Sequence, residues 1–243
     1  MPFTGSHPAA VLPFLRTPLP ASALVIGSMA PDFPYYVPFL PGLYTHTATA
    51  VVTTDLLLGA LAWVVWHGVL AAPATAAAPP ALRGRLAGVP VGLRSRLSGA
   101  RAVVLALAGL AVGSATHVLW DEFTHPRRWG TQHVPALEEN WGLLPGYRWL
   151  QYASGLVGGL VLLGWVLLWW RRTPGGTPSE TRAPWWPWVL LAAAGAAAGA
   201  AGALTAPSLG AAGFAGATWG GGTALAAAVL LAAGWHLRRP RAD

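Results

Sequence analysis

The sequence contains no lysine, no cysteine and few charged side chains of either sign. Charged residues make up 9% of its 243 residues and hydrophobic residues 54%, whereas soluble domains carry about 25% charged residues. The absence of cysteine excludes disulfides, thiolate nucleophiles and Cys-ligated zinc, so metal ligands have to be His, Asp or Glu. This composition predicts one integral-membrane domain rather than two soluble ones.

Long apolar stretches dominate the chain. A membrane-spanning helix needs about 20 apolar residues, and stretches of about this length lie near residues 49–70, 101–121, 149–170, 186–206 and 211–235. We therefore predict an all-α, polytopic helix bundle in the lipid bilayer with about five transmembrane helices. The arginine-dotted stretch 71–100 is interpreted as a linker.

Segment 9–30 is also about as long as a span, but it is interrupted by Arg16 and by three prolines. We predict a re-entrant or interfacial helical segment, lying at or dipping into the outer leaflet, where proline-broken backbone is covered by protein. If the segment spanned the membrane, His7 and Asp32 would lie on opposite faces and could not share a site.

The arginines are distributed unequally between the two sets of loops. Loop 71–101 has five, loop 171–184 three and the C-terminal tail three, and the opposite side has four. Those four are Arg16, Arg127, Arg128 and Arg148. Because cytoplasmic loops carry the basic excess, the N-terminus and loop 122–148 are predicted outside and the C-terminus in the cytoplasm. Arginines in such loops contact headgroups, so no nucleic-acid partner is expected.

Three metal-competent side chains lie four residues apart at the end of the second apolar stretch. His117 pairs with Asp121, and Asp121 with His125, because residues four apart share a helix face. However, His117 and His125 lie about 12 Å apart along a straight helix, which is far for two ligands of one ion. Either Asp121 bridges two metals, or the helix breaks before Pro126 and His125 folds back.

Further candidate ligands precede the first span, on the same predicted face. They are His7, Asp32 and His46. Together the six groups could supply one closed site or two adjacent ions. Imidazole and carboxylate suit zinc, manganese or iron, and we expect a divalent metal, with zinc favoured. The simpler alternatives are interfacial histidines, a turn at Asp32, and His–Asp pairs that satisfy each other.

Two acids are candidates for catalysis. Asp55 lies about two turns inside the first apolar stretch, and an intramembrane acid is a functional candidate; it either handles protons or pairs with a polar group on another helix. Glu122 points about 100° away from Asp121 on a helix, and is either a general base or a solvated loop acid. The nearby arginines could hold a phosphate or contact headgroups.

The last two apolar stretches offer packing rather than chemistry. They contain no ionisable residue from Trp185 to Trp235, and Gly195, Gly199 and Gly202 lie in an Ala-rich run. Small residues at this spacing let helix backbones approach closely in lipid. We therefore interpret these glycines as a helix-packing face.

Three motifs carry a family resemblance. The opening MPFTGSHPAAVLP, the GSMAPDF of 27–33 and the THVLWDEFTHP of 116–126 resemble a bacterial integral-membrane family of the domain-of-unknown-function kind. That family is in turn similar to membrane-bound metal-dependent hydrolases. The resemblance covers about residues 1–170 and implies a multi-pass protein of the bacterial cytoplasmic (inner) membrane. The implied ligands are His7, Asp32, His46, His117, Asp121 and His125.

The resemblance also sets the predicted domains. Residues 1–170 form a family core with the metal site and three transmembrane helices, and 171–243 form two Ala/Gly-rich packing helices and a basic tail. The leading hypothesis is a metal-dependent hydrolase at the extracytoplasmic membrane face, acting on an ester or phosphodiester presented by the bilayer, of which a lipid is one candidate, with Asp32 or Glu122 accepting the proton. The alternative is a non-enzymatic ion-binding transporter or envelope scaffold, motivated by Asp55 and the Gly-rich tail.

Overall fold

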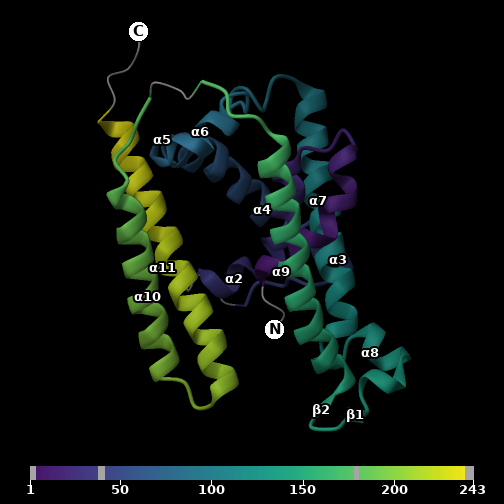
Figure 1. Ribbon diagram of the computed structural model, residues 1–243. Coiled ribbons are helices and arrows are strands. Elements are labelled where there is room, and N and C mark those ends of the chain that lie inside the picture. Colours follow the sequence, from purple (N-terminus) through teal and green to yellow (C-terminus); the bar gives the residue numbers. More distant parts are fainter. Residues whose placement is uncertain (1–3, 38–41, 178–180, 239–243) are drawn as a thin grey trace. The chain divides into compact units, whose positions relative to one another are not determined.

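The computed structural model of the protein describes residues 4–37, 42–177 and 181–238 (Figure 1). Its helices, in chain order, are η1 (Thr4–Arg16), α1 (Ala21–Met29), η2 (Ala30–Asp32), α2 (Phe33–Tyr36), α3 (Ala48–Val52), α4 (Thr54–Val65), η3 (Trp66–Leu70), α5 (Ala71–Ala77), α6 (Pro80–Leu86), α7 (Ala100–Thr124), α8 (Trp129–His133), η4 (Pro135–Leu137), α9 (Gly146–Arg172), α10 (Trp186–Leu204) and α11 (Leu209–Leu237). A short antiparallel hairpin pairs β1 (Asn140–Trp141) with β2 (Leu144–Pro145). The all-α prediction is confirmed for the described residues.

In the described part of the chain, five helical stretches are long and apolar enough to cross a membrane, as predicted. They are Thr54–Ala77, Ala100–Thr124, Gly146–Arg172, Trp186–Leu204 and Leu209–Leu237. The protein is therefore a multi-pass membrane protein. The first span differs from its predicted bounds of 49–70, because the helix breaks at Thr53 and continues through η3 and α5. Residues 71–77 and 80–86, interpreted from the sequence as linker, are helical.

The π-helix η3 precedes a proline inside the first span. Pro73 has no N–H to donate to the carbonyl of Val69, four residues earlier, so that acceptor is freed. The imidazole of His236 on α11 hydrogen-bonds this carbonyl at 3.0 Å. A side chain from the last helix thus satisfies the group that the proline leaves open, which is how lipid-embedded helices tolerate proline.

The chain divides into two compact units. Unit 1 comprises Met1–Pro34, Gly42–Trp63 and Ser98–Arg171, and unit 2 comprises Tyr35–Pro41, Val64–Leu97 and Arg172–Asp243. The end of unit 1 lies next to the predicted domain boundary at 170. Residues 64–97, placed by sequence in the N-terminal part, group with the last two helices.

In unit 1, α1 packs against α7 at backbone contact. A Cβ added to Gly27 would lie 2.2 Å from the carbonyl oxygen of Leu110, and one added to Gly113 would lie 2.3 Å from that of Leu24. No side chain fits at either position, so the two glycines set the distance between the helices. This contact brings the end of α1 next to the C-terminal half of α7.

The N-terminal segment folds back so that Thr4 and Asp32 meet. The hydroxyl of Thr4, at the start of η1, donates to Asp32 Oδ2 at 2.5 Å, so both ends of the intervening chain meet. Helix α1 has nine residues and is about 13 Å long, less than half of a bilayer core of about 30 Å. The segment folds back on itself at Thr17–Pro20, and its place at or in the outer leaflet, as a re-entrant or interfacial segment, stays a prediction.

Cysteine labelling tests this topology cleanly because the chain has no cysteine of its own. We expect Gly5→Cys to react with a membrane-impermeant maleimide from the same face as Leu143→Cys, since position 5 lies at the site end of η1. Leu143 is 94% exposed in the β1–β2 hairpin. Gly88→Cys, in the loop that precedes α7 in the sequence, should label only from the opposite face. Labelling of position 5 from the Gly88 side would contradict the re-entrant segment.

In unit 2, α10 and α11 form an antiparallel pair (Figure 1). Cβ atoms added to Gly199 and Gly220 would lie 2.8 Å from the carbonyl oxygens of Gly216 and Gly195 respectively. The predicted glycine packing face is confirmed, and α11 supplies the matching glycines.

Candidate metal site

The site in unit 1 is built on the last two turns of α7. His117 and Asp121 lie one turn apart on the same buried face, at 0% and 3% exposure, and His117 Nε2 lies 3.5 Å from Asp121 Oδ2. The other ring nitrogen, Nδ1, donates to the carbonyl oxygen of Ser28 at 2.7 Å. Because a carbonyl can only accept, Nδ1 carries a proton, and Nε2 faces the carboxylates.

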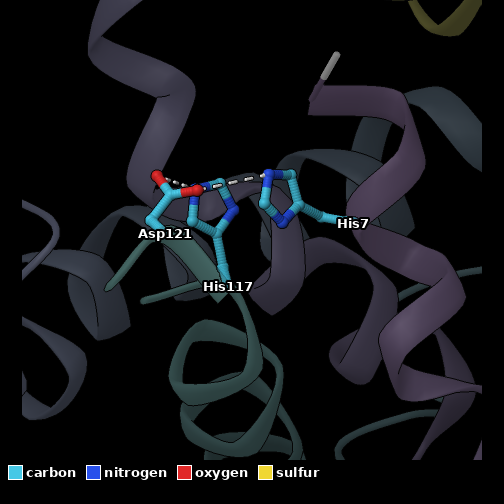
Figure 2. A group of neighbouring side chains, drawn as sticks. All are labelled: His7, His117 and Asp121. Atoms are coloured by element: carbon cyan, nitrogen blue, oxygen red, sulfur yellow. Dashed lines mark ion pairs between the residues drawn. The ribbon is translucent and has the colours of Figure 1, made fainter. Parts of the chain in front are cut away.

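The N-terminal segment adds Asp32 and His7 to this face. Asp32 Oδ1 lies 3.7 Å from His117 Nε2, and His7 Nε2 lies 3.9 Å from Asp121 Oδ1. The imidazoles of His7 and His117 stack with their centroids 3.7 Å apart. Figure 2 shows the Asp121 carboxylate facing both rings, with His7 coming from η1 and the other two residues from α7.

The loop before α3 adds His46. Its Nε2 lies 3.1 Å from Asp32 Oδ1 and 3.6 Å from Asp121 Oδ2, and its Nδ1 is 2.8 Å from the Thr45 hydroxyl. His46 has a φ of 61°, a left-handed conformation that costs energy for a non-glycine residue and is concentrated at functional sites. The guanidinium of Arg128 donates to the His46 carbonyl at 2.8 Å and helps hold this conformation.

The donor atoms suit a divalent cation in number, type and spacing. Two groups, His7–His117–Asp121 and Asp32–His46–His117, each have their donor atoms within 4.8 Å of one another. Donors bound to zinc at about 2.1 Å in a tetrahedron lie about 3.4 Å apart, and the measured separations of 3.1–3.9 Å bracket this value. Among the described residues, neither His7 Nε2 nor His117 Nε2 has a hydrogen-bond partner, although both are buried.

The protonation states of His7 and Asp32, which lie outside the spanning helices, also suit a cation. Burial, together with the neighbouring His117, lowers the pKa of His7 to about 4. Burial by itself would raise the pKa of Asp32, but hydrogen bonds from His46 and Thr4 and the charge of His117 outweigh it and hold that pKa below its usual value. At neutral pH His7 is neutral and Asp32 is ionised, which are the metal-binding forms.

His125 lies beyond the end of the helix, as in the second of the two predicted arrangements, in which the helix breaks before Pro126. Helix α7 ends at Thr124, and His125 is extended, with φ −127° and ψ 145°, as Pro126 requires. Its Nδ1 lies 3.3 Å from Asp121 Oδ1 and its Nε2 3.2 Å from the Gln151 amide. His125 therefore contacts the cluster through Asp121 and lies outside both groups of donor atoms. Its side chain is 19% exposed.

The two predicted catalytic acids lie at the edges of the cluster. Asp55 is buried, accepts a hydrogen bond from Ser114 at 3.1 Å, and is close enough to His46 and His117 to interact with them electrostatically. Glu122 faces the other way. Its carboxylate accepts from the backbone N–H of Trp129, the first residue of α8, at 2.7 Å.

Several positioning residues escaped the sequence reasoning. Thr4, Ser28 and Gln151 touch Asp32, His117 and His125 respectively. Gln151 could have been predicted, because it is a lone amide in a spanning helix. The Ser28 contact could not, because it uses a backbone carbonyl, which every residue type has. Two threonines next to ligands also contact the cluster, Thr45 at His46 and Thr124 at Asp121. Thr47 instead caps α3 and Thr116 bonds within α7.

Comparison with known protein families identifies the family of the chain. The sequence model of the family described as "Domain of unknown function (DUF4184)" matches residues 1–233. The chain belongs to this family, and the match includes the last two helices, beyond the first 170 residues that carried the resemblance. Neither the curated proteins nor the solved structures contain a match to this chain.

Proposed function

We propose that the protein is a metal-dependent hydrolase that holds one divalent ion, zinc by preference, within the buried cluster at the end of α7. The ligands are His7, Asp32, His46, His117 and Asp121. The observation that carries the proposal is the pair of buried Nε2 atoms, on His7 and His117, that have no hydrogen-bond partner in the described chain and face two carboxylates. Leaving such atoms unsatisfied is costly, and a cation satisfies both.

The chemistry follows from this donor set. A bound divalent ion lowers the pKa of a water molecule towards about 7 and polarises a scissile carbonyl or phosphoryl group. The chain itself orients the ligands: the Ser28 carbonyl fixes the His117 tautomer, and the Thr124 hydroxyl donates to Asp121 at 3.5 Å. Such supporting contacts strengthen metal binding by about 10–100-fold.

The group best placed to move a proton is His125 rather than Glu122. Its Nδ1 is directed at Asp121 while its Nε2 faces Gln151, so a carboxylate orients a partly exposed imidazole, as in catalytic triads. The carboxylate of Glu122 is already engaged, because it accepts a hydrogen bond from the backbone at the start of α8. Arg128 lies beside the site and offers a guanidinium to a phosphate, which favours a phosphodiester over a simple ester.

The substrate is a lipid or another ester presented by the bilayer at its extracytoplasmic face. The site lies at one end of a spanning helix, and eleven of the fifteen arginines lie in loops on the opposite side. By the positive-inside rule the C-terminus is then cytoplasmic, the N-terminus outside, and the membrane is the bacterial inner membrane.

Turnover by the full chain in lipid vesicles tests this function. We expect the purified protein to carry one zinc per chain and to hydrolyse vesicle phospholipids, with loss of activity under a chelator and recovery on adding zinc. His125→Ala should keep the metal but lower kcat by about 100-fold, the usual contribution of a general acid–base group. A metal-loaded protein that hydrolyses neither phosphodiester nor carboxyl-ester lipids would overturn the proposal.

Cation transport is the second candidate function, favoured by one observation. Asp55 lies inside the first span beside the cluster, and its Oδ1 is buried with no hydrogen-bond partner among the described residues. A path would continue through further polar side chains, yet the remaining described part of the span is polar only at His67 and Thr75. Zinc uptake into protein-containing vesicles, absent in Asp55→Asn, would favour transport over hydrolysis.

A further inference from the structure

The cluster offers more ligands than a catalytic zinc ion keeps. Its two groups of donor atoms share His117, so that five side chains face one another. A catalytic zinc ion commonly has three protein ligands and one position open to water, and it sometimes expands to five ligands in the transition state. With all five donors on the ion, the site is closed to water. For the proposed hydrolysis, on which this role rests, one ligand has to leave.

Of the five ligands, all of them described residues, only His46 lies outside a helix. The other four lie on η1, η2 and α7, whereas His46 lies in the connection before α3. Residues 42–44 and 48–49, on either side of it, are exposed, and Tyr44 is 82% exposed. A segment outside regular structure with exposed neighbours opens locally at low cost. The His46 ring can therefore withdraw without unfolding a helix.

The His46 backbone is also strained. Its φ of 61° lies in the left-handed region, which a residue with a β-carbon adopts only when its surroundings enforce it. The other four ligands, all within the described chain, have no positive φ. Withdrawal of the ring lets the backbone relax, so the strain favours release of this ligand over the others.

Arg128 holds His46 in the strained conformation. Its Nη1 donates to the His46 carbonyl oxygen at 2.8 Å and lies 4.0 Å from Glu122 Oε1. A hydrogen bond from a charged donor is strong enough to offset part of the strain. The Arg128 side chain is nevertheless 32% exposed, so water competes for the guanidinium. Arg128 is thus a positioning residue whose contact with His46 opens more readily than a buried one.

The ligands on helices have buried partners instead. The Ser28 carbonyl accepts from His117 at 2.7 Å, and the Thr4 hydroxyl donates to Asp32. Ser28 is fully buried and Thr4 is 7% exposed. Water does not compete for these contacts, so His117 and Asp32 stay in place when His46 moves.

We propose that His46 is the exchangeable ligand of the site: it closes the cluster at rest and withdraws to admit water, and Arg128 sets how often it does so. The space that the ring leaves faces the exposed connection, which gives water its path to the ion. Two imidazoles and two carboxylates then remain to hold the ion, from His7, His117, Asp32 and Asp121.

Azide binding to the cobalt(II)-loaded full chain tests this role without turnover, because the visible absorption of cobalt changes when a ligand binds. The vacancy variant is His46→Gly, since glycine adopts a positive φ without strain. This variant should keep its cobalt. We expect it to bind azide about tenfold more tightly than the parent, in which the position is free only part of the time.

Arg128→Gln distinguishes the positioning role from a charge effect. Loss of a positive charge by itself would weaken the binding of an anion, whereas release of His46 makes azide bind more tightly than it does to the parent. In the double variant with His46→Gly the substitution should add no further tightening, because Arg128 acts through His46. Arg127→Gln removes the same charge at an exposed neighbour and should not tighten binding.

Three results would overturn the role of His46. One is equal azide affinity of the parent and His46→Gly, and another is a loaded parent that binds no azide at all. The third is loss of cobalt from His46→Gly under conditions that load the parent, which would make His46 a fixed ligand. A parent that takes up no cobalt removes the metal site itself, whereas a loaded parent without turnover fails only the proposed hydrolysis.

Discussion

Asp121→Asn is expected to empty the metal site, lowering the affinity for zinc by at least about a hundredfold. The substitution keeps the shape of the side chain but removes the charge that faces His7, His46 and His117 across 3.5–3.9 Å. Loss of a residue that merely supports a ligand already costs about 10–100-fold, and Asp121 contacts more of the cluster than any supporting residue. Metal content after dialysis against a graded series of chelator concentrations measures the effect.

The matched control is the neighbouring acid. Glu122→Gln makes the same chemical change one residue later, outside the cluster, and should leave the metal content unchanged, with little loss of stability because the amide oxygen still accepts from the Trp129 N–H. Fewer than one ion per chain in the parent protein would mean that the imidazoles satisfy the carboxylates as protonated pairs. That result would remove the metal site and the hydrolase with it.

Gly27→Ala is expected to destabilise the protein strongly, as Gly113→Ala should on the facing helix. The new Cβ would lie 2.2 Å from the carbonyl oxygen of Leu110, and a backbone atom cannot rotate away as a side chain can. The substitution therefore pushes α1 off α7, at an overpacking cost of about 1–3 kcal/mol or more. It also withdraws the Ser28 carbonyl from His117, so zinc affinity should fall together with Tm.

Gly159→Ala provides the comparison. Gly159 lies inside α9 with nothing within 4 Å of its added Cβ, and alanine is about 0.5–1 kcal/mol better than glycine inside a helix. This variant should melt at the same temperature as the parent or higher, and keep its metal. Equal melting temperatures for the Gly27 and Gly159 variants would contradict the close α1–α7 contact.

The sequence predicts the part of the site at the end of α7 better than the part that the N-terminal segment supplies. The pairing of His117 with Asp121 follows from helical spacing alone, and the extended His125 follows from Pro126, since both effects are local. The approach of His7, His46 and Asp32 could be expected only through charge counting, which gives a membrane face but no distances. Glu122 shows the limit: its direction on the helix was predictable, but its hydrogen bond to Trp129 depends on a turn that the sequence did not specify.

The sequence by itself determined the class of this protein: apolar length fixes the spans, the lack of acids and cysteine restricts the chemistry, and proline placement breaks the N-terminal segment into short helices. These properties are set by the transfer of groups between water and lipid, which depends on composition and local pattern. The tertiary structure alone decided which nitrogen of His117 faces the carboxylates, and that His46 is held in a strained conformation. Those features depend on contacts between residues far apart in the chain, where separations of a few tenths of an ångström decide whether two groups bind an ion or each other.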